Sequence, residues 1–114
     1  MTMIDPGAEI EITGYQWVPD FARGFVRDLR PRWACEEAGI RYRERLADVR
    51  DKPGWLLEAQ PWGQVPIMRD GDIVLFESGA TLLHLGEKSE ALLPREGQAR
   101  ADALSWLLGA FNSI

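Results

Sequence analysis

The pattern of apolar and polar residues predicts a strand and then a long helix at the beginning of the chain. Residues 9–13 alternate glutamate with isoleucine, the two-residue period of a strand with one buried face. Across residues 19–38 apolar side chains recur at helical spacing, and Gly39 follows as a stop signal. Pro31 lies within this segment and has no amide hydrogen, so we expect the helix to kink or restart there.

Shorter segments continue this alternation of strands and helices. Residues 40–49 predict a second strand, and residues 53–59 predict a short helix. Two apolar runs, residues 65–68 and 73–76, are separated by four residues that include an Asp-Gly pair suited to a tight turn. These two runs predict an antiparallel pair of strands.

Two helices are predicted for the last part of the chain. Ser78 is a good N-cap for the first of them. The second, residues 99–114, has an apolar stripe at positions i, i+3, i+4 and i+7: Leu104, Leu107, Leu108 and Phe111. The predicted order is therefore β-α-β-α-β-β-α with one extra amphipathic helix, an α/β fold. Because nothing follows in the chain to cover the stripe, we expect it to be exposed and to drive the formation of homodimers or larger species.

Composition narrows the class of protein. Hydrophobic residues make up 46% of the chain and charged residues 27%, the balance of a soluble globular domain. The net charge of -5 argues against a nucleic-acid partner. No apolar run is long enough to cross a membrane and residues 1–7 do not resemble a signal peptide, so the cytoplasm is the expected location.

A single cysteine and a single histidine leave little room for metal or disulfide chemistry. Cys35 cannot form an internal disulfide, a CxxC pair or a zinc cluster, and His84 has no cysteine or second histidine to join it. We therefore predict no metal and a structural role for His84. Cys35 lies toward the end of the first predicted helix, where the helix dipole does not lower a thiol pKa, so a buried, unreactive side chain is expected.

One stretch with a distinctive spacing is Gln60-Pro61-Trp62-Gly63-Gln64-Val65-Pro66. It resembles the Asn/Gln-Pro-x-Gly-x-Val-Pro signature of the glutathione transferase superfamily, in which the last proline follows a cis peptide bond. The resemblance implies that Gln64, Val65 and Pro66 help to bind glutathione, with the Val65 backbone pairing with the cysteinyl backbone of the ligand as a strand would. The alternative is that this stretch only opens a strand.

A second motif, Phe76-Glu77-Ser78-Gly79-Ala80, follows about ten residues later. It resembles the Glu-Ser pair at the strand-to-helix junction of the same family. A helix N-terminus offers free amides and a positive partial charge, which suit the γ-glutamyl carboxylate, with the Ser78 hydroxyl as a further donor. The resemblance implies that Glu77 receives the ammonium group of glutathione, while the alternative is an ordinary N-cap.

The residue that stabilises the glutathione thiolate is not evident. Members of the family carry a serine, tyrosine or cysteine just after the first strand, but one alignment places Val18 at the usual serine position. Tyr15 is the nearby aromatic hydroxyl and is the candidate catalytic residue, with packing at the end of a strand as the alternative.

The resemblance extends over most of the chain, roughly residues 10–114. It implies a thioredoxin-like glutathione-binding domain in residues 1–88 with a mixed four-stranded sheet, and an interdomain link with the first helix of an otherwise absent all-helical domain in residues 89–114. The implied function is a transferase that conjugates the glutathione thiolate to a small electrophilic molecule, with glutathione as co-substrate. The alternatives are a non-catalytic binding or interaction module and an inactive fragment, and the chain alone is expected to catalyse poorly.

Overall fold

A mixed four-stranded sheet lies at the centre of the computed structural model, which describes residues 2–113. The strands are β1 (Ile10–Tyr15), β2 (Tyr42–Ala47), β3 (Ile67–Asp70) and β4 (Ile73–Phe76), in the spatial order β2-β1-β3-β4. β1 runs parallel to β2 and antiparallel to β3, and β3 runs antiparallel to β4. The mixed sheet is thus the one that the sequence predicts.

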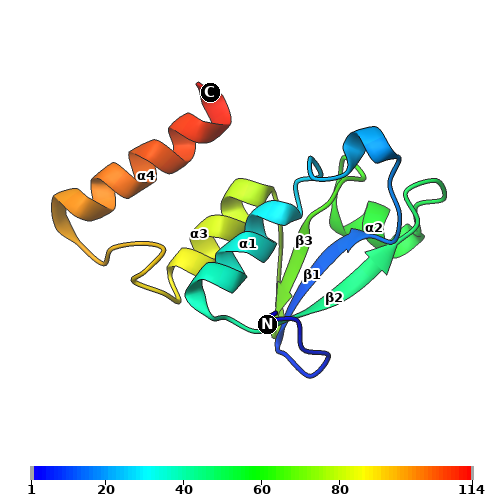
Figure 1. Cartoon of the computed structure of the whole chain (residues 1–114), viewed down its shortest axis with the longest axis horizontal. Coiled ribbons are helices and arrows are strands. Elements are labelled where there is room, and N and C mark those ends of the chain that lie inside the picture. Colours follow the sequence, from blue (N-terminus) through cyan, green and yellow to red (C-terminus); the bar gives the residue numbers. More distant parts are fainter. Residues whose placement is uncertain (1, 114) are drawn as a thin grey trace.

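Helices cover both faces of this sheet, as Figure 1 shows. α1 (Leu29–Ala38) and α3 (Ser78–Gly86) lie side by side on one face, and α2 (Gly54–Ala59) lies on the other. The core beneath α1 and α3 contains Ile10, Ile12, Ala34, Cys35, Tyr42, Met68 and Leu85. A second core beneath α2 contains Ala47, Leu56, Val65 and Ile67. Burial on both faces makes this a thioredoxin-like α/β arrangement, as predicted.

The helix predicted for residues 19–38 is wrong in its first ten residues. The chain there forms a loop with one 3-10 turn (Asp20–Ala22), and α1 begins at Leu29. This start places Pro31 at the third helical position, where an amide hydrogen would have no partner within the helix. The apolar spacing upstream does not indicate a core face, because Phe21 and Phe25 are 84% and 81% exposed.

The last helix, α4 (Gly97–Asn112), lies beside α3 on the side away from the sheet (Figure 1). The sequence predicts that its whole apolar stripe is left in water, and this is wrong for Leu104, Leu107 and Phe111, which are half-buried. Leu108 remains 58% exposed. The packing is loose, because an apolar cavity of about 200 Å³ remains between α1, α3 and α4.

Candidate functional site

The loop that leads into β3 is held by its own polar contacts. The side-chain oxygen of the buried Gln60 accepts a hydrogen bond from the backbone amide of Trp62 at 2.6 Å. Lys52 Nζ donates a hydrogen bond to the carbonyl of Gly63, also at 2.6 Å. The peptide bond between Val65 and Pro66 is cis. Within residues 2–113 the amide and carbonyl of Val65 have no hydrogen-bond partner from the protein. A backbone donor and acceptor are therefore unpaired at this point, although Val65 is 5% exposed.

The two sequence motifs meet at the same end of the β3–β4 hairpin. Ile67 lies opposite Phe76, so the residues just beyond the ladder on the two strands are Pro66 and Glu77. Glu77 has φ of 76°, a left-handed conformation that is costly for a side chain with a Cβ and that concentrates at functional sites. The turn at Glu77 leads directly into Ser78, the first residue of α3.

The beginning of α3 has the donors of an anion-binding site. The amides of Ser78, Gly79 and Ala80 have no backbone partner outside the helix in the described part of the chain. Ser78 is 4% exposed, and its Oγ accepts a hydrogen bond from Arg30 Nη1 at 2.9 Å. Glu77 is exposed and forms no hydrogen bond or ion pair through its carboxylate with any other residue in the range 2–113. A free carboxylate and a group of free donors thus stand next to each other.

Tyr15 lies close to the residues of the first motif. A shallow cavity of about 220 Å³ is lined by Tyr15, Val26, Gln64 and Val65, together with Phe25 and Arg27. Burial raises the pKa of Tyr15, and the negative charge of Asp28 raises it further. The hydroxyl therefore remains protonated at neutral pH and is available as a hydrogen-bond donor.

Val18 contributes only an apolar side chain to this region. It lines a separate cavity of about 210 Å³ with Tyr15 and Val26. The structure thus brings Tyr15, Gln64 and Val65 together around one cavity, while Glu77 and Ser78 stand at the start of α3 and do not line it. The cavity residues and the Glu77–Ser78 pair thus lie at the same end of the hairpin but in different parts of it.

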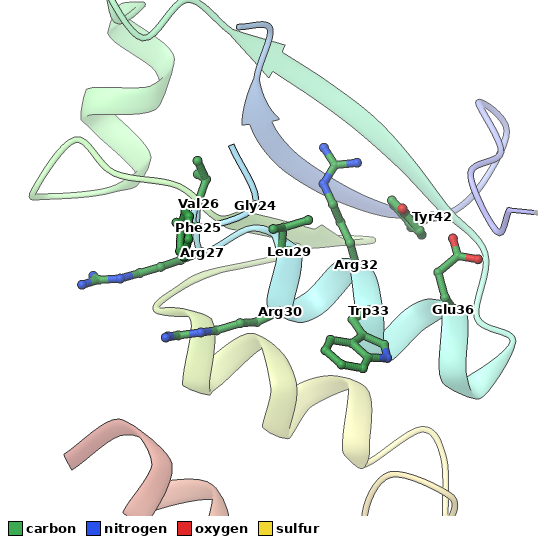
Figure 2. A pocket seen from close by; sticks show the side chains of 10 residues that line it. All are labelled: Gly24, Phe25, Val26, Arg27, Leu29, Arg30, Arg32, Trp33, Glu36 and Tyr42. Atoms are coloured by element: carbon green, nitrogen blue, oxygen red, sulfur yellow. The ribbon is translucent and has the colours of Figure 1, made fainter. Parts of the chain in front are cut away.

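The side chain of Arg30 lies at the start of α3, and the sequence patterns did not single it out. A groove of about 670 Å³ lies along α1. Figure 2 shows that Arg27 and Arg30 point to one side of it and that Arg32 points toward the sheet. The guanidinium of Arg30 stands 4.6 Å from the centre of the Phe111 ring in α4. The three arginines at positions 27, 30 and 32 stand out in an acidic chain and could have pointed to a functional role for one of them. Helical spacing alone, however, does not tell which of the three reaches a neighbouring helix.

Cys35 has the character of a core residue. It is completely buried, and burial raises the pKa of its thiol to about 12, with the charge of Glu36 adding to the shift. A thiol with so high a pKa is a poor nucleophile at neutral pH. The histidine, His84, is half-buried and its Nε2 lies 2.7 Å from Asp70 Oδ2.

No cluster of three or more histidine, cysteine, aspartate or glutamate side chains suited to a metal ion occurs in residues 2–113. Across the same residues no helix has the length and hydropathy needed to cross a membrane.

Fold and site together define a thioredoxin-like domain with a cis-proline before β3 and a Glu-Ser pair at the start of α3. The family model described as "Glutathione S-transferase, N-terminal domain" matches residues 21–87, more than half of the chain. The chain belongs to this family.

Individual relatives agree with this assignment. "Glutathione S-transferase 1" of Zea mays is 38% identical over 74 residues, which cover 62% of this chain and 35% of the maize protein. The rice protein "Probable glutathione S-transferase DHAR1, cytosolic" (Oryza sativa subsp. japonica) is 32% identical over 66 residues, which cover 58% of this chain and 31% of the rice protein.

A solved structure extends the likeness to nearly the whole chain. The theta class glutathione S-transferase of Xanthomonas axonopodis pv. citri, solved with glutathione bound, superposes with a TM-score of 0.72 at 26% identity. The superposition covers 93% of this chain and 50% of that structure. The chain thus spans about half the length of this solved relative.

Proposed function

We propose that this chain is the glutathione-binding domain of a glutathione transferase. The observation that carries the proposal is the meeting, at one end of the β3–β4 hairpin, of the unpaired backbone of Val65 with the free donors of Ser78 and α3. The Val65 amide and carbonyl pair with the cysteinyl backbone of glutathione in the manner of an added strand, and Gln64 and Pro66 flank this contact. The glutathione bound to the Xanthomonas relative supports this assignment.

The γ-glutamyl end of glutathione is an α-amino acid with an ammonium and a carboxylate. Ser78 and the amides at the start of α3 bind the carboxylate, because hydrogen-bond donors and the helix dipole favour a negative charge there. Glu77 binds the ammonium group. The absence of a protein partner for the Glu77 carboxylate in the described residues supports this role.

In the whole protein, the function we propose is conjugation of the glutathione thiolate to a small electrophilic molecule. Tyr15 donates a hydrogen bond to the thiolate and lowers the pKa of the bound thiol. Its place beside Val65 and Gln64 supports this role. The assignment of residues 1–88 to the glutathione-binding domain and of residues 89–114 to an interdomain link with the first helix of a helical domain belongs to the same proposal.

Assembly and location follow the same proposal. Exposed apolar side chains on α4, with Trp106 at 74% and Leu108 at 58%, support a homodimer. A cytoplasmic location is supported by the name of the rice relative, which describes that protein as cytosolic.

A non-catalytic glutathione-binding or interaction module is the second candidate. It is favoured by Val18, which has no polar atom to offer a thiolate at the usual serine position. Conjugation of a chloronitrobenzene by the protein separates the two candidates, because a module binds glutathione without turnover.

Calorimetric titration with S-methylglutathione tests the proposal directly. We expect binding in the micromolar to millimolar range, and a loss of tenfold or more, as an order of magnitude, in both Ser78→Ala and Glu77→Gln. Glu90→Gln, at an exposed position beyond α3, is the control and should bind as the unaltered chain does. Absence of binding by a chain that is folded by circular dichroism would overturn the proposal.

A further inference from the structure

Arg30 connects three helices at the place where α3 begins. Its Nη1 donates to Ser78 Oγ at 2.9 Å, and its guanidinium stands over the ring of Phe111 in α4. Figure 2 shows the Arg30 side chain extending from α1 over the first turn of α3. A planar cation fixed by two contacts from different helices is already oriented before any ligand arrives.

The charge of Arg30 is not neutralised by the protein. Acidic residues outnumber basic ones by 18 to 13, yet in the part of the chain that the structure describes Arg30 forms no ion pair with a carboxylate. Other arginines on α1 and β2 do find acidic partners, as Arg32 does with Asp28 and Glu44. Glu77, next to Ser78 in the chain, does not pair with Arg30 either. A cation that bonds to Ser78 and an anion on the preceding residue therefore lie near each other without pairing.

This separation of charges matches a free α-amino acid. A zwitterionic ligand end brings an ammonium group for Glu77 and a carboxylate for Arg30. The Arg30 contact uses a lone pair of Ser78 Oγ, so the Ser78 hydroxyl hydrogen remains able to donate to the same carboxylate. Arg30 has four further N–H donors, and hydrogen bonds between charged groups are about twice as strong as neutral ones.

We infer that Arg30 contacts the α-carboxylate of the γ-glutamyl group and makes this carboxylate a requirement for binding. The inference rests on the proposed glutathione site and adds to it a specificity-determining residue from α1. A competing explanation is that Arg30 only holds α1, α3 and α4 together. In that case its removal would weaken all ligands of the site alike.

A cycle of two ligands and two proteins separates these explanations. The ligands are S-methylglutathione and the analogue in which a 4-aminobutanoyl group replaces the γ-glutamyl group, so that only the α-carboxylate is lost. In the unaltered chain we expect S-methylglutathione to bind about tenfold or more tightly than the analogue. In Arg30→Gln this preference should shrink to about threefold or less, while the affinity for the analogue changes by less than about twofold.

Arg27→Gln is the matched control, since it removes the same charge three residues earlier. Arg27 lines the same groove, but has no hydrogen bond to Ser78. It should keep the preference for the carboxylate. If Arg30→Gln retains the full preference, or if Arg27→Gln loses as much of it, the inference is wrong.

The folding of the variants and the proposed glutathione site are checked separately. Arg30→Lys keeps the charge and most of the side chain, so it serves in the same cycle if Arg30→Gln does not fold, and it should give an intermediate loss of preference. If both variants keep the preference, Arg30 has no part in binding the carboxylate. If the unaltered folded chain binds neither ligand, the proposed glutathione site itself fails, and the inference fails with it.

Discussion

Asp28 and Arg32 form an ion pair in front of Gly14, with Asp28 Oδ2 at 2.7 Å from Arg32 Nε. Arg32 also pairs with Glu44 on β2, so the start of α1 is tied to the sheet. A Cβ at Gly14 would lie 2.7 Å from both Asp28 Oδ2 and Arg32 Nη2. The ion pair can therefore pack directly against the backbone of Gly14 because this residue has no side chain.

We therefore predict that Gly14→Ala destabilises the fold. The new methyl group must push apart two charged groups that are largely buried, which costs about 1–3 kcal/mol. Urea unfolding followed by circular dichroism measures the loss. Gly54→Ala is the control, because no atom lies within 4 Å of a Cβ there, and it should change stability by less than about 1 kcal/mol. An unchanged midpoint in Gly14→Ala would contradict the close approach of Asp28 and Arg32 to Gly14.

A second prediction concerns the pH dependence of stability at Asp70. Hydrogen bonds from Lys88 and His84 lower the pKa of Asp70. A lowered pKa in the folded state contributes stability above the unfolded pKa of about 4, and this contribution is lost as the pH falls through the folded pKa. The difference in Tm between the unaltered chain and Asp70→Asn should be present at pH 7 and should narrow below about pH 4.

The control for this series is Asp72→Asn, in the same hairpin turn. Asp72 is exposed and forms no ion pair within the described residues, so its replacement should leave Tm nearly unchanged at neutral pH. If the difference for Asp70→Asn were constant from neutral to acidic pH, its cause would be packing and not charge.

Cys35 should be unreactive as long as the protein is folded. Its thiol is completely buried and its pKa is raised to about 12, so little thiolate exists at pH 8. We expect a disulfide reagent such as Ellman's reagent to label Cys35 slowly in buffer and rapidly in urea. Labelling of the folded chain as fast as that of free glutathione would show that the thiol is accessible after all.

Tyr15→Phe tests the proposed thiolate donor. Binding of S-methylglutathione should stay within about twofold, because this ligand has no thiol to ionise. The thiol pKa of bound glutathione, followed by ultraviolet absorbance, should rise by about 1 unit or more. Tyr42→Phe removes a hydroxyl from β2 and should leave that pKa unchanged. The role proposed for Tyr15 is wrong if both variants give the same thiol pKa as the unaltered chain.

Two exposed apolar side chains on α4 predict self-association. Light scattering should find dimers or larger species at micromolar concentration, because Trp106 and Leu108 are exposed on the same helix. Trp106→Glu combined with Leu108→Glu should shift the population toward monomers, and Asn112→Glu on the same helix should not. If the unaltered chain is monomeric at this concentration, the proposal of a homodimer loses its support.

Parts of the site could be recognised from local sequence because their chemistry is local. The Gln60 to Pro66 stretch carries its own turn contacts, such as the hydrogen bond between the Gln60 side chain and the Trp62 amide. Ser78 follows β4 after one residue and begins α3, so its position at a helix N-terminus follows from a short pattern, although Glu77 and not Ser78 is the N-cap residue. Arg30 could not be assigned in this way, since its contacts with Ser78 and Phe111 join residues 48 and more positions apart.

The sequence by itself determined the order of strands and helices, the two motifs that carry the family likeness, and the burial of Cys35. Only the tertiary structure decided that α1 begins at Leu29, that Tyr15 lies beside Val65, and that Arg30 reaches Ser78. The physical reason is that periodicity along a chain reports which side of an element is apolar, but not which element lies opposite it. Phe21 and Phe25, upstream of Leu29, have helical spacing and still remain in water, whereas Val26 in the same loop packs against the core beneath α2.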